Sequence, residues 1–173
     1  MPLIAHTPLN LSGSVDALWV YDSPLEPAAW LDGYAGVYMD RFDRWLDEDD
    51  EVQGFPDPYH RVDIRSTSAR VEVRARGELI ASSDRALVLS ETALANRYYL
   101  PVEDVTAPLS GPTPTSTFCP YKGTASYWTI TTAGGELPDA AWSYEAPFPE
   151  CGPIKSYVSF WGDDVEITAT RGS

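Results

Sequence analysis

The segment RVEVRARGELIA, residues 70–81, predicts a β-hairpin and with it the class of the domain. In its first five residues apolar and charged side chains alternate, with the two-residue period of a strand that buries one face. Arg76 and Gly77 then mark a turn, and residues 78–81 supply a second apolar run. The same kind of signal recurs along the rest of the chain.

Short apolar segments of strand length follow this hairpin, on both sides of a Pro-rich loop at residues 106–116. They are residues 86–89, 98–100, 126–130, 141–144, 157–161 and 165–168. Gly134 and Gly135 lie between two of them and give a hairpin signal. Fifteen prolines and twelve glycines also favour many turns. We therefore expect a mostly β domain of about eight short strands.

The N-terminal part is predicted to differ. Residues 1–16 are polar and interrupted by Pro and Gly, so we expect a tail. Residues 38–46, YMDRFDRWL, have apolar side chains at roughly helical spacing and predict one short helix. The acidic run at residues 46–51 lacks the alternating ligands and central Gly of a calcium loop, which leaves a solvated helix end as the alternative. Residues 56–63, PDPYHRVD, predict a rigid connector because each Pro holds its predecessor extended.

An internal repeat is visible at a constant offset of 123 residues. The pattern WxYxxP begins at Trp19 and again at Trp142, and a tyrosine follows at the same distance in both places. We interpret residues 17–62 as a partial earlier copy with the predicted helix. We expect it to pack on a complete domain formed by residues 63–173.

Composition argues against several classes of function. The chain has 26 Asp and Glu against 12 Lys and Arg, a formal net charge of −14, and such a surface repels phosphate backbones and anionic lipid. No window approaches the roughly 20 apolar residues that cross a bilayer. The N-terminus has no basic or continuous apolar part of a secretory signal. We therefore expect a cytoplasmic protein without nucleic-acid or membrane partners, and its oligomeric state stays open.

The metal-binding and catalytic motifs of common enzymes are missing from the sequence. Cys119 and Cys151 have no Cys or His partner at CxxC-like spacing, which argues against zinc. We expect two reduced thiols, with a disulfide between them as the alternative. His6 and His60 support no Ser-His-Asp constellation, and the chain has no P-loop, GxGxxG or HExxH motif. The prediction is therefore no metal and no cofactor.

Several motifs between Val71 and Ile167 match a known family. The most specific is CPYKG at residues 119–123, followed by the YW pair at 127–128. The other motifs are GELIA (77–81), RA (85–86), ET (91–92), YYLP (98–101), EDV (103–105), AWxY (141–144) and PIxxYVxF (153–160). In these motifs the chain resembles the family named for domain of unknown function 427 (DUF427), which is also labelled NTP_transf_9.

The resemblance implies a β-tent architecture, in which two small antiparallel sheets meet at an angle around a cleft. Residues 34–65 resemble the junction in two-repeat members of the family, and Ala93 stands where the family usually has Gly. Zinc-binding relatives of the fold use paired CxxC motifs, which are absent here. The nucleotidyltransferase-like label has no support in the sequence, because phosphoryl chemistry requires paired metal-binding acids beside a Gly-rich anion cradle.

Uncommon polar side chains gather in the region of resemblance. Lys122 is one of two lysines and follows Cys119 closely, where it would either lower the pKa of the thiol or anchor a ligand. The alternative is an ion pair of Lys122 with Glu91 or Asp104. Arg85 would clamp a carboxylate or phosphate, with Glu91 as a base or positioning group, and an ordinary ion pair between the two is the alternative.

Three functional hypotheses follow. The first is a small-molecule-binding domain, with or without enzyme activity, for an anionic or carbonyl-bearing ligand. Its predicted ligand-binding residues are Arg85, Glu91, Tyr98, Cys119, Lys122, Tyr127 and Tyr144, of which Glu91, Cys119 and Lys122 are the catalytic candidates. The second is a non-catalytic protein-interaction or structural module, and the third is redox use of the two cysteines. The first hypothesis requires Lys122 and Arg85 to converge on one hollow.

Overall fold

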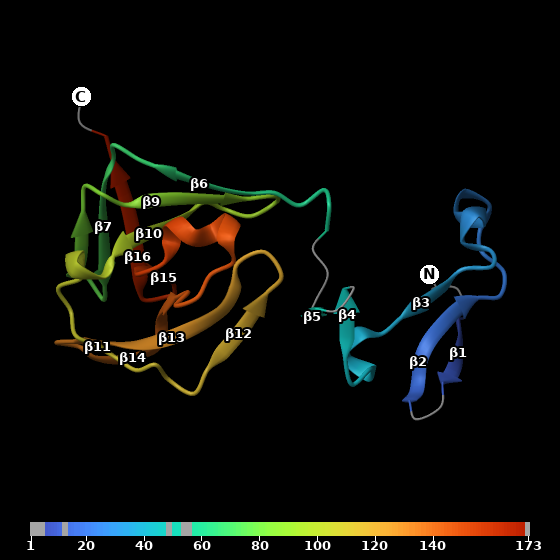
Figure 1. Ribbon diagram of the computed structural model, residues 1–173. Coiled ribbons are helices and arrows are strands. Elements are labelled where there is room, and N and C mark those ends of the chain that lie inside the picture. The colour runs from blue at the N-terminus through green and yellow to red at the C-terminus, as the bar shows by residue number, and fades with distance from the viewer. Residues whose placement is uncertain (1–5, 12–13, 48–49, 53–56, 172–173) are drawn as a thin grey trace. The chain divides into compact units, whose positions relative to one another are not determined.

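The chain forms two compact units, Met1–Phe55 and Pro56–Ser173. The computed structural model describes residues 6–11, 14–47, 50–52 and 57–171 (Figure 1). The connector that precedes β6 belongs to the second unit, although the sequence placed it in the N-terminal segment. No helix in the described ranges combines the length and apolar character that crossing a bilayer requires.

An eight-stranded antiparallel sheet is the main element of the second unit. In spatial order its strands are β11 (Leu109–Ser110), β13 (Gly123–Thr132), β14 (Gly135–Ser143), β15 (Tyr157–Phe160), β10 (Arg97–Pro101), β9 (Leu87–Glu91) and β6 (Val62–Ser66), and β12 (Ser116–Cys119) also pairs with β13. The two halves of this sheet spread apart, and the 3-10 helix η4 (Pro149–Ile154) lies between them (Figure 1). This arrangement agrees with the expected mostly β, tent-like class.

A three-stranded sheet of β16 (Val165–Thr170), β7 (Arg70–Ala75) and β8 (Glu78–Ser83) packs against the larger one. The β7–β8 pair is the hairpin predicted from residues 70–81, and its turn residues Arg76 and Gly77 both have positive φ. The apolar residues of β7 are fully buried. The largest side chains of this first core are Val71, Val73, Ile80, Leu100, Ile130, Val158 and Phe160.

A second core lies on the other face of the large sheet. Neighbouring residues on a strand point to opposite faces, so Leu100 enters the first core and Tyr99 the second. The helix η4 closes the second core with two buried side chains. Its members are Leu89, Tyr99, Ala125, Tyr144, Cys151 and Ile154. Both cores consist entirely of residues from the second unit.

The first unit contains a three-stranded sheet and short elements. They are β1 (His6–Leu11), β2 (Ser14–Tyr21), η1 (Glu26–Leu31), β3 (Ala35–Val37), η2 (Met39–Arg41), β4 (Trp45–Asp47) and β5 (Asp50–Val52). Strand β1 and the start of β2 occupy the segment for which a tail was expected. Part of the acidic run at residues 46–51 lies outside the described residues.

The helix expected over residues 38–46 is replaced by a single 3-10 turn and a strand. The turn ends at Phe42, whose backbone is extended. The rings of Phe42 and Trp45 then meet edge to face, with centroids 4.9 Å apart. The spacing of Phe42 and Trp45 thus allows their rings to meet across a turn and does not form one face of a helix. A short apolar pattern alone does not distinguish a helix from such a turn.

The segments that share the 123-residue offset have corresponding elements. Helix η1 and helix η4 occupy equivalent positions, and both have a proline at the start. Strands β2 and β3 pair Trp19 with Gly36, and strands β14 and β15 pair Trp142 with Ser159. Trp142 and Ser159 each lie 123 residues after Trp19 and Gly36, so the strands of the two segments pair in the same register. This correspondence supports the interpretation of the first segment as a partial copy.

Candidate functional site

Glu91, at the end of β9, accepts hydrogen bonds from two basic side chains. Lys122 Nζ donates to Glu91 Oε2 at 2.5 Å, and His60 Nε2 lies 2.9 Å from Glu91 Oε1. An ionised carboxylate only accepts, so His60 Nε2 carries the proton in this contact. The exposed fractions of the side chains are 9% for Lys122, 11% for Glu91 and 21% for His60. The ion-pair alternative for Lys122 is therefore present in the structure.

The charge of Glu91 is set by a balance of two effects. Burial by itself raises the pKa of the Glu91 carboxyl, because it penalises the charged form. Hydrogen bonds from Lys122 and His60 outweigh burial, and the pKa of Glu91 lies below its ordinary value. Glu91 is therefore ionised at neutral pH, and it holds the two basic side chains together.

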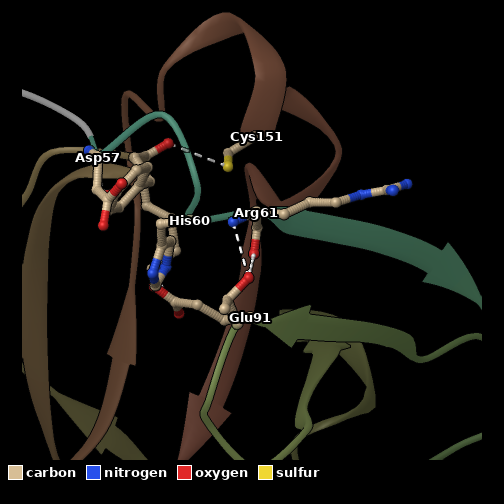
Figure 2. A network of polar contacts seen from close by, with 8 residues as sticks. Asp57, His60, Arg61, Glu91 and Cys151 are labelled. Atoms are coloured by element: carbon tan, nitrogen blue, oxygen red, sulfur yellow. Dashed lines mark hydrogen bonds and ion pairs between the residues drawn. The ribbon is translucent and has the colours of Figure 1, made fainter.

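Tyr121 connects three segments that are distant in the sequence. Its ring stacks on the His60 imidazole, with centroids 4.2 Å apart and an angle of 22° between the planes. Its hydroxyl accepts a hydrogen bond from the backbone N–H of Asp57 at 2.7 Å. Its carbonyl oxygen accepts one from Cys151 Sγ at 3.3 Å (Figure 2). The connector, the turn before β13 and the helix η4 therefore all fix the position of His60.

The backbone beside Glu91 is also held. The first residue pair of β6 and β9 is Val62 with Glu91. Beyond it, Thr92 N–H donates to the carbonyl of Arg61 at 3.0 Å, and Arg61 N–H donates to Thr92 Oγ1 at 2.9 Å (Figure 2). The strand pairing thus extends into the connector, and it brings His60 to the same end of β9 as Glu91.

A hollow of about 540 Å³ borders this network. It is lined by Pro58, His60, Arg61, Val62, Pro120, Tyr121, Phe148, Glu150 and Cys151. Most of its wall is apolar, and His60 and Tyr121 bring the polar network to its surface. The volume falls within the range of about 300–1,000 Å³ that is usual for small-molecule sites.

The buried thiol and phenols near this network are held in their neutral forms. Cys119 and Cys151 are free thiols. Burial raises the pKa of the Cys151 thiol, and burial likewise raises the pKa of Tyr99 and Tyr144. A protonated thiol is a poor nucleophile. The raised pKa of Cys151 therefore gives no support to nucleophilic use of this thiol.

Arg85 lies away from this network. It precedes β9, whereas Glu91 ends it, and a strand of this length separates the two by roughly 20 Å. Arg85 forms an ion pair with Asp104 of η3 (Val102–Asp104) at 2.7 Å, and its side chain is 63% exposed. The hydrogen bond from Arg85 lowers the pKa of Asp104. The expected Arg85–Glu91 pair and the expected convergence of Arg85 with Lys122 are both corrected here, since each basic side chain pairs with an acid at its own end of β9.

The remaining predicted residues are divided between the two faces of the large sheet. Tyr127 and Tyr144 lie on the face of the second core, and Tyr127 shares a hydrogen bond of 2.9 Å with Thr117 Oγ1. Cys119 is half-buried at the end of β12 and contributes to the raised pKa of Tyr144. Tyr98 packs against the first core, on the opposite face. The structure thus brings Glu91, Lys122, Tyr127, Tyr144 and Cys119 to one side of the sheet.

His60 was left out of the site by sequence reasoning, because it lies outside the segment that resembles the family. The rigid PDPYHRVD connector was the available signal, and it did not show which residue its histidine contacts. Within the ranges that the structure describes, no group of three or more His, Cys, Asp or Glu side chains is placed to hold a metal ion.

A known protein family matches most of the second unit. The family model described as Domain of unknown function (DUF427), NTP_transf_9, matches residues 63–171. The matched range contains Glu91 and Lys122, and it begins three residues after His60 of the connector. No curated protein matches the chain.

Proposed function

This chain belongs to the DUF427 family, and we propose that it is a small-molecule-binding domain whose site is the hollow beside His60, Tyr121 and Cys151. The family description names no activity, so the proposal rests on the geometry of this chain. The proposed ligand has an apolar body and one carbonyl or carboxylate group.

The single observation that carries the proposal is the Lys122–Glu91–His60 network at the wall of a mostly apolar hollow. A buried ion pair contributes little net stability compared with apolar side chains of the same size. Ionisable groups that are buried and held by specific partners are, in contrast, common at binding and catalytic sites. A functional use of the network explains its presence better than a structural one.

His60 is the member of the network that reaches the hollow. Its Nε2 is held by Glu91, and its Nδ1 has no hydrogen-bond partner among the described residues. In the charged imidazolium form, Nδ1 donates to a carbonyl or carboxylate oxygen of the ligand. Lys122 and Glu91 act through His60, because neither lines the hollow.

The rest of the lining suits the body of such a ligand. Pro58, Val62, Pro120 and Phe148 are apolar, and the stacked Tyr121 ring adds a flat surface. Small-molecule sites combine a mainly apolar wall with a few convergent polar groups. We therefore expect aromatic carboxylates and ketones to be the best first probes.

An NMR titration of the full chain with benzoate and with acetophenone tests the proposal. We expect saturable shifts of the backbone amides of His60, Tyr121 and Cys151, which the variant His60→Ala loses. Arg85→Ala is the matched control, because it removes a charged side chain from the other end of β9 and should bind like the parent. If neither probe shifts these amides, or if His60→Ala binds equally well, the proposed site is wrong.

The proposal further includes a cytoplasmic location, since free thiols such as Cys119 and Cys151 persist in reducing surroundings. It also includes the partial copy at residues 17–37, for which the shared register of the two segments is the support.

A further inference from the structure

Most basic side chains of the second unit are paired with an acid. Those with an ion pair are Arg61, Arg70, Arg74, Arg76, Arg85 and Lys122. Arg65, Arg97, Lys155 and Arg171 form no ion pair with any residue that the structure describes. Acids outnumber bases by 26 to 12 in this chain, so a cation has many carboxylates to pair with. Cations without an acid are therefore informative, and two of these four, Arg65 and Arg171, line the same hollow.

The hollow lies at one face of the large sheet. Arg65 of β6 pairs with Val88 of β9, and Val88 pairs with Tyr98 of β10, so the three side chains are cross-strand neighbours on one face. Arg171 directly follows β16, the edge strand of the smaller sheet. The hollow has a volume of about 520 Å³ and is completed by residues 66–68 and by Asn96.

The lining is rich in hydrogen-bond donors and contains no acid. Residues 66–68 are Ser, Thr and Ser, so three consecutive hydroxyls lie beside the two guanidinium groups. Arg65 uses one donor on Ser90 Oγ, and its other N–H groups have no partner among the described residues. The nearest acid on the same face of β6 is Asp63, whose carboxylate binds Arg61 at 2.8 Å. The positive charge of this hollow is therefore not neutralised by its own surroundings.

We propose that this hollow binds a tetrahedral oxyanion, the phosphate group of a small phosphomonoester. A guanidinium group offers two parallel N–H donors that match two oxygens of a phosphate, and charge-assisted hydrogen bonds of this kind are the strong ones. Hydroxyl groups satisfy the remaining oxygens. The ring of Tyr98 and the side chain of Val88 supply the apolar part of the lining, against which the organic part of the ester packs.

This site is separate from the hollow of the proposed function. Arg65 and Tyr98 lie on the face opposite to Glu91, because Glu91 is an odd number of residues from Val88 on the same strand. The two sites therefore involve different amide signals and different variants. Either proposal can fail while the other holds.

An NMR titration of the full chain with inorganic phosphate and with phenyl phosphate tests this site. We expect saturable shifts of the amides of residues 66–68 and of Asn96, with the ester binding more tightly than inorganic phosphate. In the double variant Arg65→Gln/Arg171→Gln, affinity should fall by about a hundredfold or more, since each of the two lost charge-assisted hydrogen bonds contributes about tenfold or more.

The double variant Arg74→Gln/Arg76→Gln is the matched control. Arg74 and Arg76 are exposed arginines of the same unit that pair with Glu72 and Asp164, so their loss changes the net charge equally but should leave phosphate binding unchanged. Equal loss in this control would show general charge attraction and overturn the site. So would the absence of saturable shifts with both probes. Equal affinity for inorganic phosphate and phenyl phosphate would overturn the assignment of a phosphomonoester as the ligand and would indicate a site for the free phosphate ion.

Discussion

Residues 17–37 and residues 140–160 have the same local structure in different surroundings. Each segment runs from a strand through a 3-10 helix into a second strand. The preceding hairpins also correspond, because the register shift between Leu9 and Leu11 matches the shift between Trp128 and Ile130. Burial, however, is not shared. Phe160 has no exposed surface, whereas its counterpart Val37 is 44% exposed.

The difference shows which properties of the fold are local. Strand pairing, the bulge and the helix position recur in both segments, so they follow from the segment's own sequence and turns. Burial depends on strands from elsewhere in the chain. In the second unit β7, β8 and β10 cover Phe160, and the described part of the first unit contains no counterpart of these strands.

Most residues of the two proposed sites also lie outside the repeated segment. Glu91, His60 and Lys122 all precede residues 140–160, and so does Arg65. The repeated segment contributes only part of the wall of the hollow, through Phe148, Glu150 and Cys151. The residues proposed to bind the polar groups of the ligands thus lie in the part that does not recur.

The largest expected effect is a contrast between two alanine substitutions at equivalent positions. Phe160→Ala should lower the free energy of unfolding by about 4 kcal/mol, because it leaves a cavity in the first core. Val37→Ala should change it by less than about 0.5 kcal/mol, because Val37 is largely exposed. Urea denaturation followed by near-ultraviolet circular dichroism measures both values. Similar decreases in the free energy of unfolding for the two substitutions would mean that Phe160 and Val37 are equally buried, which would contradict the contrast.

The next largest effect concerns the two lysines of the chain. Lys122→Met should cost about 3 kcal/mol, because it leaves the buried Glu91 carboxylate without its main partner. Lys155→Met should cost less than about 0.5 kcal/mol, because Lys155 is exposed. The same denaturation experiment applies. In the double variant Glu91→Gln/Lys122→Met the loss should be smaller than the sum of the single losses, since the two side chains contact each other.

Part of the fold was predictable because its signals are local. The hairpin at residues 70–81 and the turn at Gly134 and Gly135 are set by residues adjacent in the sequence, and both are present. The prediction of a helix over residues 38–46 was wrong, because the spacing of apolar residues in a nine-residue segment is compatible with a turn as well as with a helix. The family assignment was confirmed, since the CPYKG block and its neighbours are specific.

The candidate sites were predictable only in part. Glu91 and Lys122 were identified as unusual polar residues, and their ion pair was one of the alternatives considered. The contact of Glu91 with His60 depends on the connector lying next to the turn before β13, and no local pattern shows such a long-range contact. The separation of Arg85 from Lys122 depends on the pairing of whole strands. Arg65 and Arg171 were missed because only the structure shows which basic side chains form ion pairs and which, like these two, do not.

Acid titration gives a smaller effect, which distinguishes the Glu91 network from the first core within the second unit. The pKa of Glu91 is lower in the folded chain than its ordinary value of 4.5, so ionised Glu91 stabilises the fold. This contribution is complete above pH 4.5 and is lost as the pH falls through the lower, folded-state pKa. The stability difference between the parent and Glu91→Gln should therefore be constant near neutral pH and shrink in acid. The difference between the parent and Phe160→Ala should not depend on pH in this way, and a parallel decline in both would contradict the assignment to Glu91.

The smallest expected effect comes from deleting the first unit. Both cores consist of residues from the second unit, so a chain that begins at Asp57 should fold cooperatively by itself. The sequence predicts that residues 17–46 pack on the complete copy, and this packing should add a small increment to its stability. The deletion should therefore lower the urea midpoint slightly. An unchanged midpoint would contradict the packing, and failure of the shortened chain to fold would contradict a self-contained core. The experiment thus decides whether residues 17–37, which have the local structure of residues 140–160 but lack the strands that bury those residues, are buried instead against the second unit.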